Sequence, residues 1–151
     1  MRMAAAVALG VALVPGTSAR ADDAKRMVVV PHDGAKWALA DPARPDGPQI
    51  AVLWGDPANG PSAMLMKFKK QDGVLHVHSS DYHLMVLEGA MKHWATEAER
   101  ASGPALGPGS YWFQPGEGAH GDSCLSDECT MFIQWAGKRD GRLATSASPR
   151  P

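Results

Sequence analysis

Hydrophobic residues along this chain gather in short runs, which are separated by glycine, proline and aspartate. After residue 48 the runs cover 50–54, 62–69, 83–94, 110–114, 119–125 and 130–135. The run at 62–69 alternates in part between polar and apolar side chains, which is the period of a half-buried strand. Short strands at this spacing, broken by turn-forming residues, predict an all-β domain in the form of a sandwich or a barrel.

The first residues show the features of a secretory signal peptide in the expected order. A short basic start precedes an apolar run at 4–14, which is too short to span a bilayer. Ala19-Arg20-Ala21 then supplies the small residues that a leader peptidase requires. We therefore expect a signal peptide at 1–21 and a mature protein that is periplasmic or secreted, with no membrane insertion after cleavage.

Composition divides the remaining chain into three parts. Residues 22–48 are rich in Pro, Gly, Ala and Asp around one apolar run, Met27–Val30, and predict an N-terminal arm with an edge strand. Residues 49–137 hold the strand pattern and predict one domain, because 151 residues that are 44% hydrophobic supply a single core. Residues 138–151 are polar and end in proline, which predicts a disordered tail.

The charge of the chain is nearly balanced. Fifteen basic and sixteen acidic residues give a formal net charge of −1, and no run of Lys and Arg is present. A nucleic-acid partner would need a basic stripe or patch. We therefore expect the partner to be a small molecule and not a nucleic acid.

The chain has two cysteines, Cys124 and Cys129, which flank a polar stretch between two apolar segments. In an oxidising compartment this arrangement predicts a disulfide across a hairpin. A thiolate metal site is the alternative, but the spacing is not C-x-x-C and no second cysteine pair completes such a site.

Histidines carry the candidate chemistry. His76 and His78 are two residues apart, so in an extended strand their imidazoles share a face and offer two nitrogen ligands to one metal. A second segment begins at Gly109 and leads through Pro115 and a glycine-containing turn to His120.

These two segments resemble the motifs of the cupin superfamily. The first cupin motif runs G…H-x-H…E…G, and His76 and His78 match its two histidines. The second runs G-x5-P-x-G-x-x-H, and it matches from Gly109 to His120, except that Glu117 stands where the family prefers glycine. The resemblance implies a single cupin jelly-roll barrel, a double-stranded β-helix, over 49–137. It also implies a divalent metal on the three histidines.

The glutamate that usually adds another ligand in cupins is missing. Counting back from Gly89, its place falls on Tyr82; counting forward from His78 with the longer gap, it falls on His83. If His83 is a ligand, four histidines surround the metal, and imidazole is the better donor for a divalent ion. If Tyr82 holds the place, three histidines bind the metal and the phenol acts as a catalytic residue that can hydrogen-bond a substrate.

By resemblance, cupins with all-histidine sites include iron-dependent dioxygenases that cleave diketones. The first hypothesis is therefore an oxygenase that uses Fe(II), with Zn, Cu, Ni or Mn as alternatives, and acts on a small oxygen-rich molecule. The second is a non-enzymatic periplasmic module that binds a metal or a small molecule. Cupins commonly dimerise, so the resemblance is also compatible with a homodimer.

Overall fold

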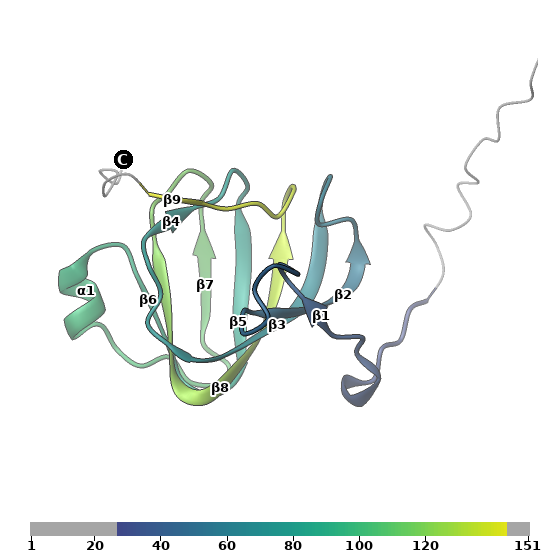
Figure 1. The fold of residues 1–151 in the computed structure, drawn as a ribbon, viewed down its shortest axis with the longest axis horizontal. Helices are drawn as coiled ribbons and strands as arrows, with labels where there is room; N and C mark the ends of the chain where they lie inside the picture. Colours follow the sequence, from purple (N-terminus) through teal and green to yellow (C-terminus); the bar gives the residue numbers. More distant parts are fainter. Residues whose placement is uncertain (1–26, 145–151) are drawn as a thin grey trace, which may run out of the picture.

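The computed structural model describes residues 27–144. The expected signal peptide at 1–21 lies outside these residues. Most of the regular structure is β (Figure 1), which confirms the predicted all-β class. Between residues 27 and 144, no helix is long and apolar enough to cross a bilayer. In chain order the elements are η2 (His32–Gly34), β1 (Ala38–Leu39), β2 (Gln49–Gly55), β3 (Ser62–Gln71), β4 (His76–Val77), β5 (Tyr82–Glu88), β6 (Met91–Trp94), α1 (Glu97–Ser102), β7 (Tyr111–Gln114), β8 (Gly121–Trp135) and β9 (Arg142–Leu143).

Seven strands form one antiparallel sheet around β8. Its hydrogen-bonded strands follow the order β1-β2-β3-β8-β5-β7, and β6 pairs with the first part of β8. β4 and β9 form a separate two-stranded sheet, which lies near the upper end of the large sheet in Figure 1. The large sheet runs from β1 to β7 without closing into a ring.

Alternation along the strands gives the large sheet a strongly apolar inner face. In β5, Tyr82, Leu84 and Val86 are buried, while the residues between them are exposed. Met131 and Ile133 of β8 lie opposite Val86 and Leu84 and are equally buried. Each such side chain contributes roughly 1.5–3 kcal/mol when fully buried. The same face carries the polar residues described below, so the core fixes their positions.

The predicted disulfide is present, but its setting differs from the expected hairpin. Cys124 and Cys129 are bonded, with their Cα atoms 5.8 Å apart, and both lie within β8. The ladder with β3 is irregular here, because Lys69 pairs with Glu128 and Gln71 already pairs with Cys124. The disulfide therefore bridges the point where β8 bends from its β6-paired part to its β3-paired part.

A short helix, α1, occupies a stretch for which the sequence reasoning gave no element. Thr96 caps it by accepting a hydrogen bond from the Glu99 N–H, and the Glu99 carboxylate accepts one from the Thr96 N–H. This is a capping box, whose signature of Thr followed three residues later by Glu is readable from the sequence.

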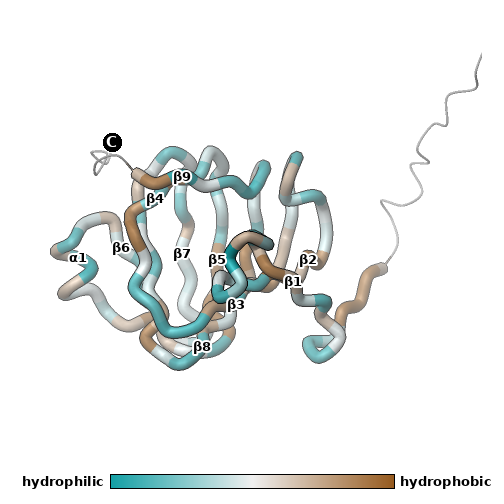
Figure 2. The backbone as a smooth tube through the Cα atoms, in the orientation of Figure 1, coloured by the Kyte–Doolittle hydropathy of each residue, from teal (hydrophilic) through white to brown (hydrophobic). Residues whose placement is uncertain are grey.

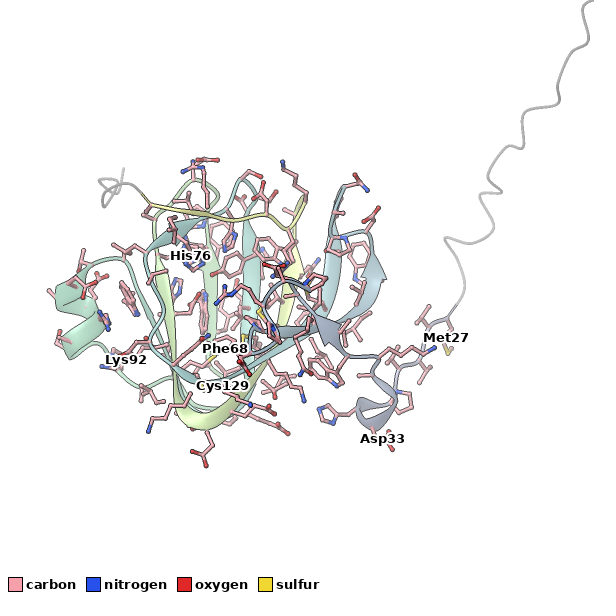
Figure 3. All side chains as sticks on the ribbon, in the orientation of Figure 1. Met27, Asp33, Phe68, His76, Lys92 and Cys129 are labelled. Carbon is pink, nitrogen blue, oxygen red and sulfur yellow. A yellow bond between two sulfur atoms is a disulfide. The ribbon has the colours of Figure 1, made fainter. Side chains whose placement is uncertain are left out.

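The N-terminal apolar run does not form the expected edge strand. Residues 27–30 have no regular structure and Met27 is 90% exposed. Figure 2 shows this hydrophobic segment leading away from the sheet, and Figure 3 labels Met27 at its end. The edge position is taken instead by Ala38–Leu39, which pairs with β2.

The first part of the expected tail is ordered. Arg142 and Leu143 form β9 and pair with Val77 and His76 of β4. The Arg139 N–H donates to the Pro57 carbonyl at 2.7 Å, and the Ala144 N–H donates to the Leu75 carbonyl at 3.1 Å. We call residues 138–144 the C-terminal strap. A two-residue strand such as β4 needs partners for its backbone groups, and the strap supplies those on one of its two edges.

Candidate metal centre

Backbone hydrogen bonds hold the two histidine segments together. The His76 N–H donates to the His120 carbonyl at 2.8 Å, and the His120 N–H donates to the His76 carbonyl at 2.9 Å. Residues paired in this way lie directly opposite each other, with their side chains on the same side. The Glu117 N–H donates to the His78 carbonyl at 2.8 Å, which fixes the same register between the two histidine segments at His78.

The three histidines His76, His78 and His120 form one cluster. One ring nitrogen from each lies within 4.8 Å of the others, and the ring centroids are 4.4–5.2 Å apart. Metal–nitrogen bonds of about 2.0–2.1 Å allow two ligand atoms to lie up to about 4.2 Å apart. A small adjustment of the rings would therefore place all three nitrogens on one ion. Figure 3 labels His76, the first residue of β4.

Each of these histidines is oriented by a backbone carbonyl. Nδ1 of His76 lies 2.9 Å from the Val74 carbonyl oxygen, and Nδ1 of His120 lies 3.0 Å from that of Gly118. Nδ1 of His78 is hydrogen-bonded to the carbonyl oxygen of Asp140 in the C-terminal strap. Carbonyls only accept, so every Nδ1 carries its proton and every Nε2 keeps a lone pair. Metal-binding histidines are held in this way, so the donor set fits a divalent metal.

Burial favours the uncharged form of two histidines of the cluster, His120 and His78. It lowers the pKa of His120 to about 4, because the ring is 1% exposed and its charged form would lose hydration. Burial is also the main cause of the lowered pKa of His78. A neutral imidazole is the form that binds metal, so protons compete little with a metal for these two rings at neutral pH.

The structure separates the two candidates for the missing glutamate. Tyr82 faces inward, is 2% exposed, and places its hydroxyl 3.1 Å from Nε2 of His120. Trp112 Nε1 donates to the same hydroxyl at 3.5 Å. Burial, with the negative charge of Asp122 as a second cause, raises the pKa of Tyr82 well above its usual value. Tyr82 therefore stays protonated and can donate a hydrogen bond.

His83 lies outside the cluster, which corrects the expectation of a fourth histidine ligand. Neighbouring residues of a strand face opposite sides, so an inward Tyr82 forces His83 outward. Its ring is exposed, lies over Phe113, and its Nδ1 is 2.7 Å from the Tyr111 hydroxyl.

The sequence reasoning missed a carboxylate beside the cluster. Asp122 follows His120 by two residues and shares its face, which the strand period alone could have indicated. Its Oδ1 accepts a hydrogen bond from His93 Nδ1 at 2.8 Å, and its Oδ2 lies 4.0 Å from Nε2 of His120. Burial raises the pKa of Asp122, but the hydrogen bond from His93 and the electrostatic effect of the surrounding histidines together outweigh it and hold the pKa below its usual value. The site therefore carries the negative charge of Asp122 next to the three histidine rings.

A cavity of about 460 Å³ opens onto the cluster. His76, His78, Tyr82 and Asp122 line it together with apolar side chains of β3, β5 and β8. The C-terminal strap contributes Arg139, Gly141, Arg142 and Leu143 to the lining. Pockets of this size and mixed lining suit a small organic molecule, since a few polar groups orient it within apolar walls.

The chain matches one protein family over most of its length. The family is described as "Domain of unknown function (DUF4437)", and the match covers residues 13–147. No curated protein matches the chain.

Solved structures share the fold at low sequence identity. An RmlC-like cupin from Ralstonia eutropha has a TM-score of 0.61 at 14% identity, with 78% of this chain and 73% of that chain covered. The polyketide cyclase RemF from Streptomyces resistomycificus has a TM-score of 0.62 at 19% identity, covering 80% and 87%. A proposed acetylacetone dioxygenase from Methylibium petroleiphilum has a TM-score of 0.60 at 15% identity, covering 83% and 87%. These likenesses establish a cupin fold and no activity.

Proposed function

Since the chain belongs to the DUF4437 family and has a cupin fold, we propose that it holds one divalent metal ion on His76, His78 and His120. One observation supports this most strongly: all three Nδ1 atoms are committed to backbone carbonyls, so the three Nε2 atoms are left as acceptors within one cluster, where that of His120 now meets the Tyr82 hydroxyl. Three protein ligands leave positions open for exogenous molecules, which is typical of catalytic metal sites and not of structural ones.

The reaction proposed is that of an Fe(II)-type oxygenase acting on a small oxygen-rich molecule. Bound Fe(II) would supply a Lewis acid with positions for dioxygen and a chelating substrate oxygen. The imidazole set also suits Zn, Cu, Ni or Mn. A dioxygenase assignment is supported by the proposed acetylacetone dioxygenase among the similar structures.

The protein's own residues have separable roles in this proposal. Tyr82 donates a hydrogen bond to a substrate oxygen and is the proposed catalytic residue. Asp122, held by His93, supplies a fixed negative charge that partly offsets the charge of the metal. The apolar walls of the cavity exclude water, which strengthens each of these interactions.

A binding module without catalysis is the second candidate. It is favoured by the partners of Tyr82, because its hydroxyl is hydrogen-bonded to His120 and Trp112 and not committed to a position in the cavity. In that case the cavity would hold a metal and a small ligand without converting it.

The finer architecture and location belong to the same proposal. We infer a double-stranded β-helix in which the β4–β9 pair and the C-terminal strap cover the open side of the large sheet. The Cys124–Cys129 disulfide supports a periplasmic or secreted protein, because disulfides persist in oxidising compartments. A homodimer remains compatible with these features.

Metal content tests the site directly. Elemental analysis of the purified protein should give about one divalent ion per chain, and His76→Ala and His120→Ala should lose it. His83→Ala is the matched control, because it removes an exposed histidine from the other face of β5 and should keep the metal. Equal metal content in all four proteins would refute the site.

Oxygen consumption then separates the two candidates. The Fe(II)-loaded protein is given a panel of diketones and catechols, and uptake that disappears in His120→Ala supports an oxygenase. Binding of panel members without any uptake would instead support the binding module.

A further inference from the structure

Arg139 lines the metal-site cavity on the C-terminal strap. Its backbone is fixed, because its N–H donates to the Pro57 carbonyl at 2.7 Å and the next residue, Asp140, holds Nδ1 of His78. The Asp140 carboxylate in turn accepts hydrogen bonds from the N–H and the hydroxyl of Ser79 at 2.9 and 2.7 Å. Arg139 therefore extends from a rigid strap next to one of the proposed ligands.

The Arg139 side chain is a partly buried cation without a counterion. Within residues 27–144 its guanidinium has no hydrogen bond and no ion pair. Burial lowers the pKa of Arg139, and no charge or hydrogen bond offsets that burial. An arginine remains protonated in proteins, so a positive charge is held here at a cost in hydration.

The other charged residues of the cavity are already paired or exposed. Arg142 is paired with Glu117, and Arg44 is exposed. Of the carboxylates in the lining, Asp72 is paired with Arg100 at 3.2 Å and Asp122 with His93 at 2.8 Å. Arg139 is thus left to pair with a group that enters the cavity.

Arg139 also shares its cavity with the histidine cluster. His76 and His78 line the same cavity as the Arg139 side chain. A cavity of about 460 Å³ holds both groups, so a molecule of a few carbon atoms can touch the cluster and the guanidinium together.

We propose that Arg139 is an anion subsite, and that the molecule bound at the metal centre is a small oxo- or hydroxycarboxylic acid. The inference rests on the proposed metal site. A keto or hydroxyl oxygen of the acid faces the three histidines, and its carboxylate pairs with the guanidinium. A guanidinium matches a carboxylate with two parallel hydrogen bonds, which a point charge such as lysine cannot reproduce. The apolar side chains of β3, β5 and β8 pack against the short carbon skeleton.

Two probes that differ only in a carboxylate test the subsite. Calorimetry compares acetylacetone with 2,4-dioxopentanoate, which is the same diketone with one methyl group replaced by a carboxylate, on the Zn(II)-loaded protein. The wild type should bind the acid roughly tenfold or more tightly than the neutral diketone, as expected for a charge-assisted hydrogen-bonded pair. Arg139→Gln should abolish this preference, and Arg139→Lys should restore it in part.

Arg44→Gln is the matched control, because it removes an exposed positive charge from the same cavity and should keep the preference for the acid. Equal affinities for the two probes in the wild type would overturn the subsite, and so would a preference that survives in Arg139→Gln.

A failure of the metal site is distinguishable from a failure of the subsite. Elemental analysis reports the first. To test the subsite, the acid is titrated into the metal-free protein. Binding should be weaker and sensitive to salt, and Arg139→Gln should remove it. That result would support the subsite independently of the metal. Metal-free binding of the acid that is indifferent to Arg139→Gln counts against it.

Discussion

Strand β5 contributes to two histidine–tyrosine pairs, one on each of its faces, and only one pair belongs to the candidate metal centre. On the inner face, the Tyr82 hydroxyl lies 3.1 Å from Nε2 of a fully buried His120. On the outer face, the Tyr111 hydroxyl lies 2.7 Å from Nδ1 of an exposed His83. The residue types are the same, and the outer contact is the shorter. Surroundings make the difference: the inner pair has two further histidines, a carboxylate and a cavity, while the outer pair faces solvent.

The largest expected difference between the faces is in metal affinity. His120→Ala removes one of three proposed ligands and should weaken binding of Zn(II) by roughly 100-fold or more. His83→Ala should change it less than about twofold, since no proposed ligand contacts that ring. Competition with a chromophoric chelator measures both, and a comparable loss in the two variants would erase the distinction between the faces.

The inner face should also make the metal-free protein sensitive to acid. The pKa of His120 is lowered from 6.5 to about 4 in the folded protein. As pH falls, His120 therefore takes up its proton in the unfolded chain before it does so in the folded protein. The contribution of His120 to the free energy of unfolding is complete above pH 6.5 and is lost as pH falls towards 4. The loss from this residue is roughly 3 kcal/mol at 1.36 kcal/mol per pKa unit.

Urea unfolding of the chelator-treated protein at several pH values between 7.5 and 4 measures this loss. His120→Gln should flatten the curve, because glutamine does not titrate. A curve of the same steepness in that variant would show that other groups cause the acid sensitivity.

The C-terminal strap should affect the metal affinity of the histidine cluster, although it lies far from His76 and His78 in the sequence. Ending the chain at Lys138 removes the Asp140 carbonyl that orients His78, and loss of such an orienting group should weaken metal binding about 10- to 100-fold. Ending it at Ala144 keeps the strap and should leave affinity unchanged. Circular dichroism shows whether the shorter chain is folded, and full metal affinity in a folded shorter chain would contradict the role of the strap.

The smallest expected difference between the two faces is in the free energy of unfolding lost when each tyrosine hydroxyl is removed. Tyr82→Phe removes a buried hydrogen bond and should lower the free energy of unfolding by about 1 kcal/mol. Tyr111→Phe removes an exposed one and should change it by less than about 0.5 kcal/mol. Thermal or urea unfolding measures both changes, and a larger effect at Tyr111 would reverse the comparison.

The sequence contained enough to find the three clustered histidines and the all-β class. His76 and His78 share a face by strand period, and the spacing from Gly109 to His120 identified the second segment. The choice between Tyr82 and His83 could not be made by counting gaps, because counts from the two ends disagreed by one residue. One residue is the difference between the two faces of a strand, so the register of β5 against β8 had to decide it.

Other parts of the site were readable or hidden for different reasons. Asp122 lies two residues after His120, so the same strand period could have placed it beside the cluster. The strap could not be found in this way, since residues 138–144 are locally polar and their order comes from pairing with β4, more than sixty residues earlier. Local composition carries no information on such a contact.

The hydrogen bond from His78 to the Asp140 carbonyl also affects when the metal site forms during folding. These residues are 62 positions apart. Contacts between residues so distant form late, because the intervening chain must close first. The full donor set therefore exists only once residues 138–144 have folded against β4. The compartment in which folding ends, and the metals free in that compartment, would then determine which ion the protein acquires.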